Sequence, residues 1–303
     1  MKDHISVCIP TFRREGMLPR LLRNVATQQT EGQFEFSVVI IDNDADGSAR
    51  EIVSRLAAEL RLDITYAVGK VNTIPVARNH AVRLARGNFI GIIDDDEFPP
   101  PEWLRTLYRA IQAFGVDGAL GPVKPFFEDQ PPDWLVKGRF CERPVHRTGT
   151  LLKWNQTRTG NVLLKREVFE RYGVFFDERF ATGGSDQEFF RQAMSHGCRF
   201  VAVDEAPVWE VVPPERQTRS YWIRRAIVNG FNAHRYSIDQ GNNLTRVILP
   251  VKLLGATLVY ALATPLCACL GSHVLVRCLE RGGHHMSHFC AILGIELIKK
   301  RNF

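Results

Sequence analysis

Two spacings of apolar residues alternate along the first hundred positions of the chain. Short apolar runs of strand length occupy residues 5–9, 36–41, 64–68 and 89–93. The segments between these runs repeat apolar residues every three or four positions, which predicts helices over residues 18–25, 49–60 and 74–85. Strands that alternate with helices predict an α/β domain whose central sheet is mostly parallel and covered by helices on both faces.

Four consecutive acidic residues, Asp94-Asp95-Asp96-Glu97, follow the last of these runs. Adjacent carboxylates repel one another and are costly to desolvate, and a cation relieves both penalties. Mg²⁺ and Mn²⁺ prefer oxygen ligands and usually keep coordination places for phosphate or water. Because open α/β sheets bind ligands at the carboxyl ends of their strands, the cluster indicates a metal–diphosphate site. The cluster alone leaves open a solvated acidic turn before a helix that starts at Pro99-Pro100-Pro101.

Two earlier strand ends are also polar. Pro10-Thr11 follows the first apolar run, and Asp42-Asn43-Asp44 follows the second. The carboxyl ends of parallel strands lie at one edge of a sheet, so these groups are expected to lie near the acid cluster. A solvated turn explains one polar strand end better than it explains three, which favours the ligand site.

Several ordered motifs carry a family resemblance. They are Val7-Cys8-Ile9-Pro10-Thr11-Phe12-Arg13-Arg14, Val39-Ile40-Ile41-Asp42-Asn43-Asp44, Ala77-Arg78-Asn79, the acid cluster, Arg158-Thr159-Gly160-Asn161 and Gly183-Gly184-Ser185-Asp186-Gln187-Glu188. With them, residues 4–215 resemble the inverting family 2 glycosyltransferases, which have the GT-A nucleotide-sugar-binding fold. Three further features look most like bacterial exopolysaccharide glucosyltransferases of the succinoglycan type: Asp42-Asn43-Asp44-Ala45, Ala119-Leu120-Gly121-Pro122-Val123 and Val212-Pro213-Pro214-Glu215-Arg216.

The resemblance implies roles at the donor site. Asp96 is expected to be the main ligand of Mg²⁺ or Mn²⁺, and Asp94 is expected to share the metal or to hold the ribose. Asp95 is expected to contact the nucleotide, with contact to water alone as the alternative. Asp42 is expected to accept a hydrogen bond from a uracil ring. The other expected donor-binding residues are Pro10, Thr11, Arg13 and Arg78. A guanidinium pairs well with diphosphate oxygens, although Arg78 also fits an ordinary exposed helix cation.

The same resemblance makes Asp186 the expected catalytic base. Inversion by direct displacement needs a carboxylate that removes the proton of the acceptor hydroxyl. Relatives often have Glu-Asp where this chain has Ser185-Asp186, a change that leaves the second position intact. The alternative is that Asp186 only caps a helix, since aspartate is favoured near helix starts.

One departure from the family concerns Trp209. Many relatives have a histidine there that contacts the metal or the diphosphate, and tryptophan cannot ligate a metal. Glu210 or water is the expected substitute. Glu210 is also a weak candidate for the acceptor site, and Trp209 is a weak candidate for stacking on the acceptor sugar. Trp134, in a loop-like segment expected to border the acceptor cleft, is another weak candidate. A core position is the alternative for Trp209.

The charge of the chain divides it into two regions. Residues 216–303 contain 12 Lys and Arg against 3 Asp and Glu, whereas residues 1–215 contain 27 against 30. We therefore expect a catalytic domain over residues 1–215 and a basic, apolar, helical region over residues 216–303 that associates with a membrane. A basic segment also suits nucleic acid, but this one surrounds an uncharged stretch at residues 253–271, which favours anionic lipid.

The uncharged stretch is 19 residues long, barely enough to span a bilayer. A monotopic or re-entrant attachment is favoured over a span, and a soluble helical subdomain is the alternative. No signal peptide precedes the first strand, and the seven cysteines show neither a zinc spacing nor a disulfide framework. We therefore expect the catalytic domain at the cytoplasmic face of the bacterial inner membrane.

Together these features predict an inverting, metal-dependent hexosyltransferase. It is expected to move glucose from UDP-glucose to a lipid-linked oligosaccharide in surface-polysaccharide assembly, without binding nucleic acid. Two other classes stay open. One is a sugar-phosphate nucleotidyltransferase, although Pro10-Thr11-Phe12-Arg13 is not the Gly-rich loop that such enzymes usually have. The other is a catalytically silent, membrane-associated sugar- or nucleotide-binding protein, against which Asp96 and Asp186 argue.

Overall fold

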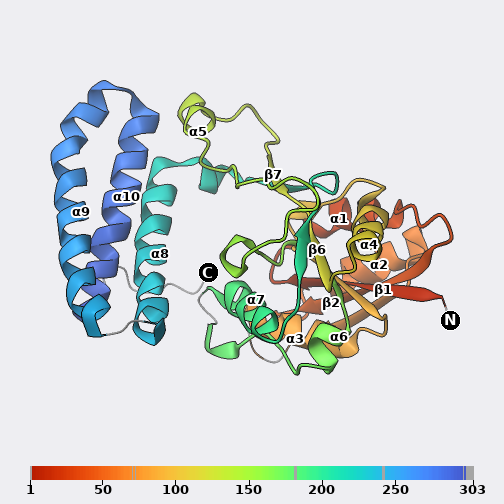
Figure 1. The fold of residues 1–303 in the computed structure, drawn as a ribbon. Coiled ribbons are helices and arrows are strands. Elements are labelled where there is room, and N and C mark those ends of the chain that lie inside the picture. Colours follow the sequence, from red (N-terminus) through yellow and green to blue (C-terminus); the bar gives the residue numbers. More distant parts are fainter. Residues whose placement is uncertain are drawn as a thin grey trace. The chain divides into compact units, whose positions relative to one another are not determined.

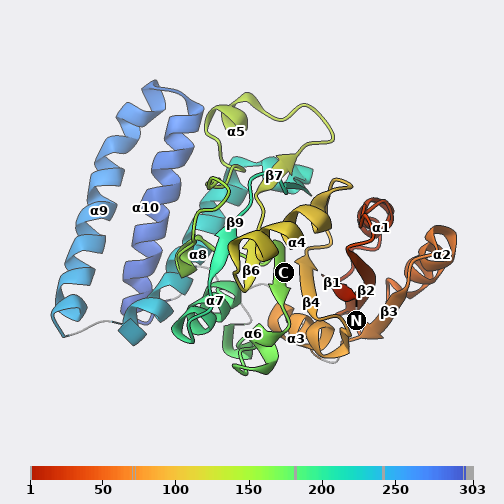
Figure 2. The same ribbon diagram turned by 45° about the vertical axis from the view of Figure 1, so that its right-hand side comes forward.

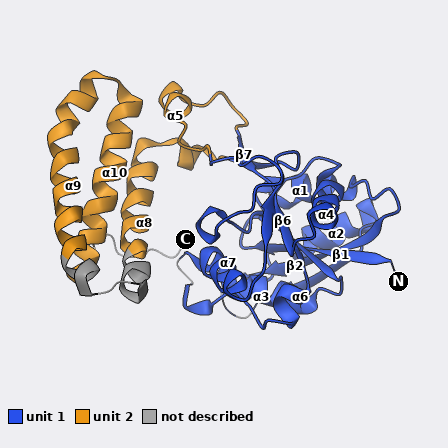
Figure 3. Ribbon diagram, in the orientation of Figure 1, with its two compact units in different colours: residues 1–126, 143–211 blue, residues 127–142, 212–303 orange. Residues whose placement is uncertain are grey.

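The structure, a computed structural model, describes residues 2–69, 71, 73–180, 183–240, 243–295 and 297, without the side chains of residues 234–247. The chain divides into two compact units (Figure 3). We call residues 1–126 and 143–211 the sheet unit, and residues 127–142 and 212–303 the helical unit. The boundary at residue 211 lies close to the expected one at 215, and the segment 127–142 joins the helical unit. Residues 241, 242, 296 and 298–303 of the expected tail lie outside the described residues.

Within the described residues, seven strands form the large sheet of the sheet unit, in the order β3-β2-β1-β4-β8-β6-β9 (Figures 1 and 2). Their bounds are β1 (Asp3–Thr11), β2 (Phe34–Asp42), β3 (Ile64–Val68), β4 (Phe89–Ile93), β6 (Gly118–Leu120), β8 (Asn161–Lys165) and β9 (Phe200–Ala202). Strands β1 to β4 are parallel, as are β6 and β9, while β8 runs antiparallel to β4 and β6. The mostly parallel sheet predicted from the sequence is confirmed.

Helices cover both faces of this sheet. Their bounds are α1 (Leu18–Ala26), α2 (Arg50–Leu60), α3 (Ile74–Leu84), α4 (Trp103–Phe114), α6 (Glu167–Glu170) and α7 (Ser185–Ser195), with short 3₁₀ helices η1 (Trp154–Gln156) and η2 (Glu178–Phe180). Ile5, Val7 and Ile9 of β1 share a core with α1, α2 and α4. Cys8, between them, shares a second core with α3, α6 and α7. Successive side chains of a strand point to opposite faces of the sheet, so the residues of β1 alternate between the two cores. Because helices cover both faces, the ends of the strands are where polar side chains can meet a ligand.

A smaller sheet stands beside the acid cluster. It orders β5 (Glu97–Phe98), β10 (Val208–Val211) and β7 (Val123–Phe126), with β10 antiparallel to β5 and parallel to β7. The register places Glu210 directly opposite Glu97 and Trp209 opposite Phe98. A segment more than a hundred residues downstream is thereby attached to the end of the acid cluster.

The helical unit contains α5 (Asp133–Lys137), η3 (Pro214–Gln217), α8 (Arg219–Gln240), α9 (Asn243–Cys269) and α10 (Ser272–Ile292). Leu135, Phe140, Trp222 and Val276 form its buried cluster and join α5 to α8 and α10. Helices α8 and α10 approach closely, since a Cβ on Gly230 would collide with the backbone of His284. The segment 127–142 thus packs on the C-terminal helices rather than standing as a free loop.

Candidate active site

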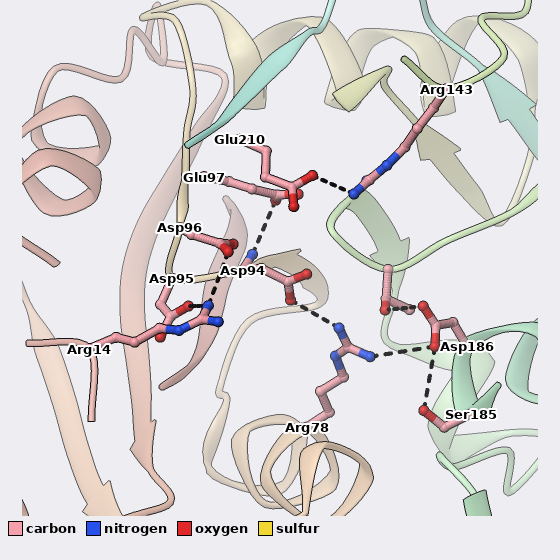
Figure 4. Close-up of polar contacts among 11 residues, drawn as sticks. Arg14, Arg78, Asp94, Asp95, Asp96, Glu97, Arg143, Ser185, Asp186 and Glu210 are labelled. Carbon is pink, nitrogen blue, oxygen red and sulfur yellow. Dashed lines mark hydrogen bonds and ion pairs between the residues drawn. The ribbon is translucent and has the colours of Figure 1, made fainter. Parts of the chain in front are cut away.

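The acid cluster follows β4 and is bound by side chains from the end of β1. The Thr11 hydroxyl donates to Asp95 Oδ2 at 2.8 Å. Arg14 Nη1 donates to both Asp95 Oδ1 and Asp96 Oδ2, each at 3.0 Å (Figure 4). These contacts exist because β1 and β4 are neighbours in the sheet, which brings residues more than eighty positions apart to the same edge. The expected meeting of polar strand ends therefore occurs, with Arg14 as the cation between them.

Burial makes this cluster costly to ionise. Burial and the nearby carboxylates of Asp94 and Glu210 raise the pKa of Asp96 to about 7. Burial and the same neighbours raise the pKa of Glu97 well above its usual value. Burial also raises the pKa of Asp95, although Arg14 and Thr11 oppose that rise. The sheet unit therefore holds several carboxyl groups whose charged forms need a further cation to be favourable.

Glu97 and Glu210 form a cross-strand pair of like charges, an arrangement that is unfavourable by itself. Glu97 is buried, and its Oε2 accepts the backbone N–H of Asp94 at 3.1 Å. A Cβ on Gly160 would lie 2.5 Å from Glu97 Oε1, so the small residue of the Thr159-Gly160 motif makes room for this carboxyl group. Arg143 pairs with Glu210 from the other side (Figure 4). Arg143 and Glu210 thus extend the acid cluster to a second arginine.

Arg78, near the start of α3, lies between the acid cluster and Asp186. Its Nη2 donates to Asp94 Oδ1 at 2.9 Å, and its Nη1 lies 3.8 Å from Asp186 Oδ1 (Figure 4). The side chain is 6% exposed, with its guanidinium carbon 5.6 Å from the centre of the Phe176 ring. The alternative of an ordinary exposed helix cation is therefore wrong for Arg78. Its expected contact with a diphosphate stays a prediction.

Asp186 is the second residue of α7. Gly184 precedes the helix with φ of 90°, a left-handed conformation that glycine adopts without strain. The Thr159 hydroxyl donates to Asp186 Oδ2 at 3.3 Å, and the Ser185 hydroxyl donates to Oδ1 at 3.4 Å. The side chain of Asp186 remains 32% exposed. Asp186 is therefore oriented by neighbours yet open to a second reactant.

Asp42 is fully buried at the end of β2. Its Oδ1 accepts the backbone N–H of Asp44 at 2.9 Å. Its Oδ2 accepts the backbone N–H of Ala49 and the Tyr66 hydroxyl, each at 2.8 Å. These bonds fold the loop between β2 and α2 around one carboxylate. The expected contact with a uracil ring stays a prediction, and the structure adds a role in holding this loop.

Replacing Tyr66 with phenylalanine tests the role of Asp42 in the loop. The variant leaves a buried carboxylate with one donor fewer, so the free energy of unfolding should fall by about 1.5–3 kcal/mol in urea denaturation. Tyr108→Phe is a matched control, because the Tyr108 hydroxyl donates to Asp3 Oδ2 at 2.6 Å elsewhere on the sheet unit. Both variants should lose stability, and only Tyr66→Phe should weaken UDP binding. Equal UDP affinity in the two variants would show that the loop between β2 and α2 is not part of the nucleotide site.

The remaining donor-site candidates also lie at the ends of β1 and β2. Pro10 and Thr11 are the last residues of β1, and Thr11 is buried. Arg13 has φ of 50° and pairs with Asp44 Oδ2 at 3.1 Å. Arg13 therefore stands over the loop that Asp42 folds.

The two acceptor tryptophans pack against aromatic neighbours. Trp209 lies in β10 and stacks on Phe98, with ring centres 5.9 Å apart. Trp134 belongs to the helical unit, where its ring centre lies 5.3 Å from that of Phe140 and the Arg219 guanidinium carbon lies 5.9 Å from it. These contacts give both rings a packing role, and their contact with a sugar stays a prediction.

The carboxylates fit a hard divalent cation in their chemistry. They are all oxygen donors, and a cation would offset the cost of ionising Asp96 and Glu97. In the described part of the chain, however, no three His, Cys, Asp or Glu side chains already stand as a metal-binding group. Arg14 and Arg143 hold the carboxylates instead. Asp94 and Asp96 stay the predicted ligands of the ion, with Glu210 or water as the predicted further ligand.

Arg14, Arg143 and Thr159 were missed from the sequence. Arg14 adjoins the expected site residue Arg13, and a basic residue after β1 facing four carboxylates after β4 was a readable signal. Thr159 lies in the quoted motif Arg158-Thr159-Gly160-Asn161 without an assigned role. Arg143 had no local signal, because its partner Glu210 lies 67 positions away.

Comparison with known proteins places this geometry in a family. The family described as glycosyl transferase family 2 matches residues 6–173. The succinoglycan biosynthesis protein ExoM of Rhizobium meliloti (strain 1021) is 30% identical over 257 residues, which cover 84% of this chain and 81% of that protein. The hyaluronan synthase of Pasteurella multocida is 26% identical over 251 residues, which are 71% of this chain and 25% of the synthase.

Solved structures show the same fold. The mannosyltransferase PcManGT from Pyrobaculum calidifontis, in complex with GDP-Man and Mn²⁺, matches 98% of this chain and 89% of its own with a TM-score of 0.64 at 19% identity. TarS 1-349 of S. aureus, in complex with UDP, matches 97% of this chain and 92% of its own with a TM-score of 0.55 at 17% identity. The architecture is thus the GT-A fold. Because the family match spans more than half of the residues of this chain, the chain belongs to glycosyl transferase family 2.

Proposed function

We propose that this glycosyltransferase transfers a hexose, glucose from UDP-glucose, with inversion to a lipid-linked oligosaccharide during exopolysaccharide assembly. The observation that carries the proposal is the pair of carboxylate groups on either side of Arg78. Asp94 stands 2.9 Å from Arg78 Nη2, and Asp186 stands 3.8 Å from Nη1. Displacement at a sugar carbon needs a leaving-group site that is separate from the catalytic base. The Arg78 guanidinium contacts Asp94 on one side and Asp186 on the other, and so sets the distance between these two carboxylates.

The reaction assigns these groups as follows. Asp186 accepts the proton of the acceptor hydroxyl as its oxygen bonds to the anomeric carbon. The bond from that carbon to the diphosphate oxygen breaks, and its electron pair leaves with the nucleotide diphosphate. Thr159 and Ser185 hold the Asp186 carboxylate through their hydroxyls. Attack opposite to the leaving group inverts the configuration of the anomeric carbon.

The leaving diphosphate belongs at the acid cluster. Asp94 and Asp96, with Glu210 in place of the histidine of many relatives, would hold Mg²⁺ or Mn²⁺, which offsets negative charge on the departing diphosphate when bound. Arg14, which is partly exposed, and the buried Arg78 are cations at the same edge of the sheet and suit diphosphate oxygens. The mannosyltransferase neighbour in complex with GDP-Man and Mn²⁺ supports a divalent cation beside a nucleotide sugar.

The donor and acceptor are proposed from relatives. TarS structures in complex with UDP and with UDP-GlcNAc support a uridine nucleotide. The succinoglycan biosynthesis relative supports a role in exopolysaccharide assembly. A growing exopolysaccharide unit carried on lipid would explain why the same chain contains a basic and apolar helical region. We place the catalytic domain, residues 1–215 as expected from the sequence, at the cytoplasmic face of the inner membrane.

A donor screen tests the proposal. The full chain is incubated with Mg²⁺ or Mn²⁺, bacterial membrane lipid extract and, in turn, UDP-glucose, UDP-galactose, UDP-GlcNAc or GDP-mannose. We expect UDP release to be highest with UDP-glucose and to depend on the extract, and we expect NMR to show a β-glucoside from the α-linked donor. An α-linked product would overturn the inverting mechanism, and a preference for another sugar would overturn the donor assignment.

A further inference from the structure

The outer face of α9 is apolar, the reverse of a helix on the surface of a soluble domain. Five residues of this face and Leu270, directly after the helix, are between 55% and 82% exposed: Val251, Leu258, Val259, Leu262, Leu266 and Leu270. We call them the α9 stripe. At 1.5 Å per residue the α9 stripe extends about 28 Å along the helix. An apolar patch of this length on a folded protein marks a surface that something else covers.

The inner face of α9 is already occupied within the helical unit. Leu253 is buried, Tyr260 stacks on His285 at 5.8 Å, and Thr264 Oγ1 lies 3.8 Å from Cys278 Sγ. The hydroxyls of Thr257 and Thr264 each donate to the carbonyl four residues earlier, at 2.8 Å. These two hydroxyls are therefore paired without water, and the exposed charge of Lys252 lies next to Val251, at one end of the α9 stripe.

Lipid fits the α9 stripe better than a protein does. Protein interfaces are enriched in aromatic residues, methionine and arginine and have a polar rim, whereas the α9 stripe is entirely leucine and valine. The segment Ile248–Cys269 is long and apolar enough to cross a membrane, the one such helix among the described residues. Residues 216–303 also carry a net charge of +9, from 12 basic and 3 acidic residues, which suits an anionic headgroup surface.

Helix α10 argues against a crossing. It packs antiparallel along α9 from the turn at Gly271 (Figure 1). It carries Arg277 and Glu280, which pair at 3.0 Å, and the exposed Arg281. Arg281 lies ten residues beyond Gly271, about 15 Å along the helix, and the hydrocarbon core is about 30 Å thick. If α9 crossed the bilayer with α10 beside it, these charges would lie near the bilayer centre, where they are costly.

We infer that the helical unit is a monotopic membrane anchor, in which α9 lies parallel to the bilayer surface with the α9 stripe embedded below the headgroups. This inference deepens the proposed function. The identity of the acceptor as a lipid-linked molecule rests on that proposed function. The attachment itself follows from α9 and α10 alone. It would hold the chain at the surface where a lipid-linked acceptor is presented.

Vesicle flotation of the full-length protein tests the attachment. We expect the wild type to float with phosphatidylcholine vesicles, and more fully when phosphatidylglycerol is included. Leu258→Gln/Leu262→Gln should lower the partition coefficient about tenfold or more, since both leucines would leave the hydrocarbon. Leu151→Gln is the matched control, because Leu151 is 58% exposed in the sheet unit, and it should float like the wild type. Equal flotation of the double variant and the wild type would overturn the inference.

The depth of α9 distinguishes lying from crossing. Tryptophan is placed singly at Leu254, Leu262 and Leu270, and its fluorescence is quenched by lipids brominated near or far from the headgroup, with the wild type as background. A helix that lies flat gives the same shallow quenching at all three positions. Deep quenching at Leu262 with shallow quenching at both ends would show a crossing helix and overturn the inference.

Two further outcomes are decisive. A protein that fails to float, and that sedimentation shows as a dimer disrupted by Leu258→Gln/Leu262→Gln, would assign the α9 stripe to a second copy of the chain. A protein that floats as expected but transfers no sugar in the donor screen would retain the anchor and overturn the proposed function. The flotation result does not depend on catalysis, so the two failures are distinguishable.

Discussion

Asp186→Asn is expected to reduce turnover about a hundredfold or more while leaving donor affinity nearly unchanged. The substitution keeps the shape of the side chain and one acceptor oxygen but removes the basic carboxylate, and general-base contributions have this scale. Asparagine is also a good residue near a helix start, so α7 should keep its stability. Initial rates with UDP-glucose and the lipid extract give turnover, and calorimetry with UDP-glucose gives affinity.

Comparing the turnover of Asp186→Asn with its donor affinity shows which role Asp186 has. If Asp186 only orders α7, the variant should turn over like the wild type, and the base must be sought elsewhere. If turnover and donor affinity fall together, the substitution has disturbed the donor site through Arg78, which lies 3.8 Å from Asp186. Glu170→Gln, a change to an exposed carboxylate on α6, gives the baseline for loss of one surface charge.

Asp96→Ala is expected to abolish the metal-dependent part of donor binding. Asp96 lies at the centre of the acid cluster, between Arg14 and the carboxylates of Asp94 and Glu210. Titration of UDP-glucose with and without Mn²⁺ should show a large gain in affinity for the wild type and none for the variant. Asp46→Ala, which removes an exposed carboxylate near Arg13, should keep the gain. A variant that retained the full effect of Mn²⁺ would remove Asp96 from the metal site.

Without metal, Asp96→Asn is expected to stabilise the protein in a pH-dependent way. The pKa of Asp96 is raised to about 7 in the folded chain, so the folded state keeps a proton that the unfolded chain loses above about pH 4. The wild type therefore loses stability as pH rises between these values, and the variant escapes that loss. Thermal melts with a chelator should show a difference in Tm that is absent at pH 4, grows to pH 7 and then levels off.

The opposite signs of these two effects have one physical origin. A carboxylate that is buried among other carboxylates is unfavourable until a cation joins it, so the residue that binds the metal also weakens the metal-free fold. Arg14 and Arg143 relieve part of that cost in the structure. Strain of this kind is typical of functional sites, where local chemistry and stability conflict.

The sequence alone determined the strands and helices of the sheet unit up to β4 and the mostly parallel character of its sheet. A two-residue period in the strands and a three-to-four-residue period in the helices are local properties, and each predicted run corresponds to a strand or helix in the structure. The acid cluster could be placed at a strand end because Asp94 to Glu97 directly follow an apolar run. The ordered motifs also predicted the family to which the chain belongs, and the comparisons confirm that prediction. The apolar character of residues 253–271 was also readable from local composition.

Only the tertiary structure decided which charges meet. Arg14 reaches Asp95 across 81 positions and Arg143 reaches Glu210 across 67, distances at which periodicity carries no information. The saturation of Asp42 by two backbone donors and Tyr66 depends on how one loop closes over a neighbouring strand. The direction of the α9 stripe depends on which face of α9 packs on α10. Each of these features arises from pairing between distant segments, and their free energy appears only when the folded chain brings the segments together.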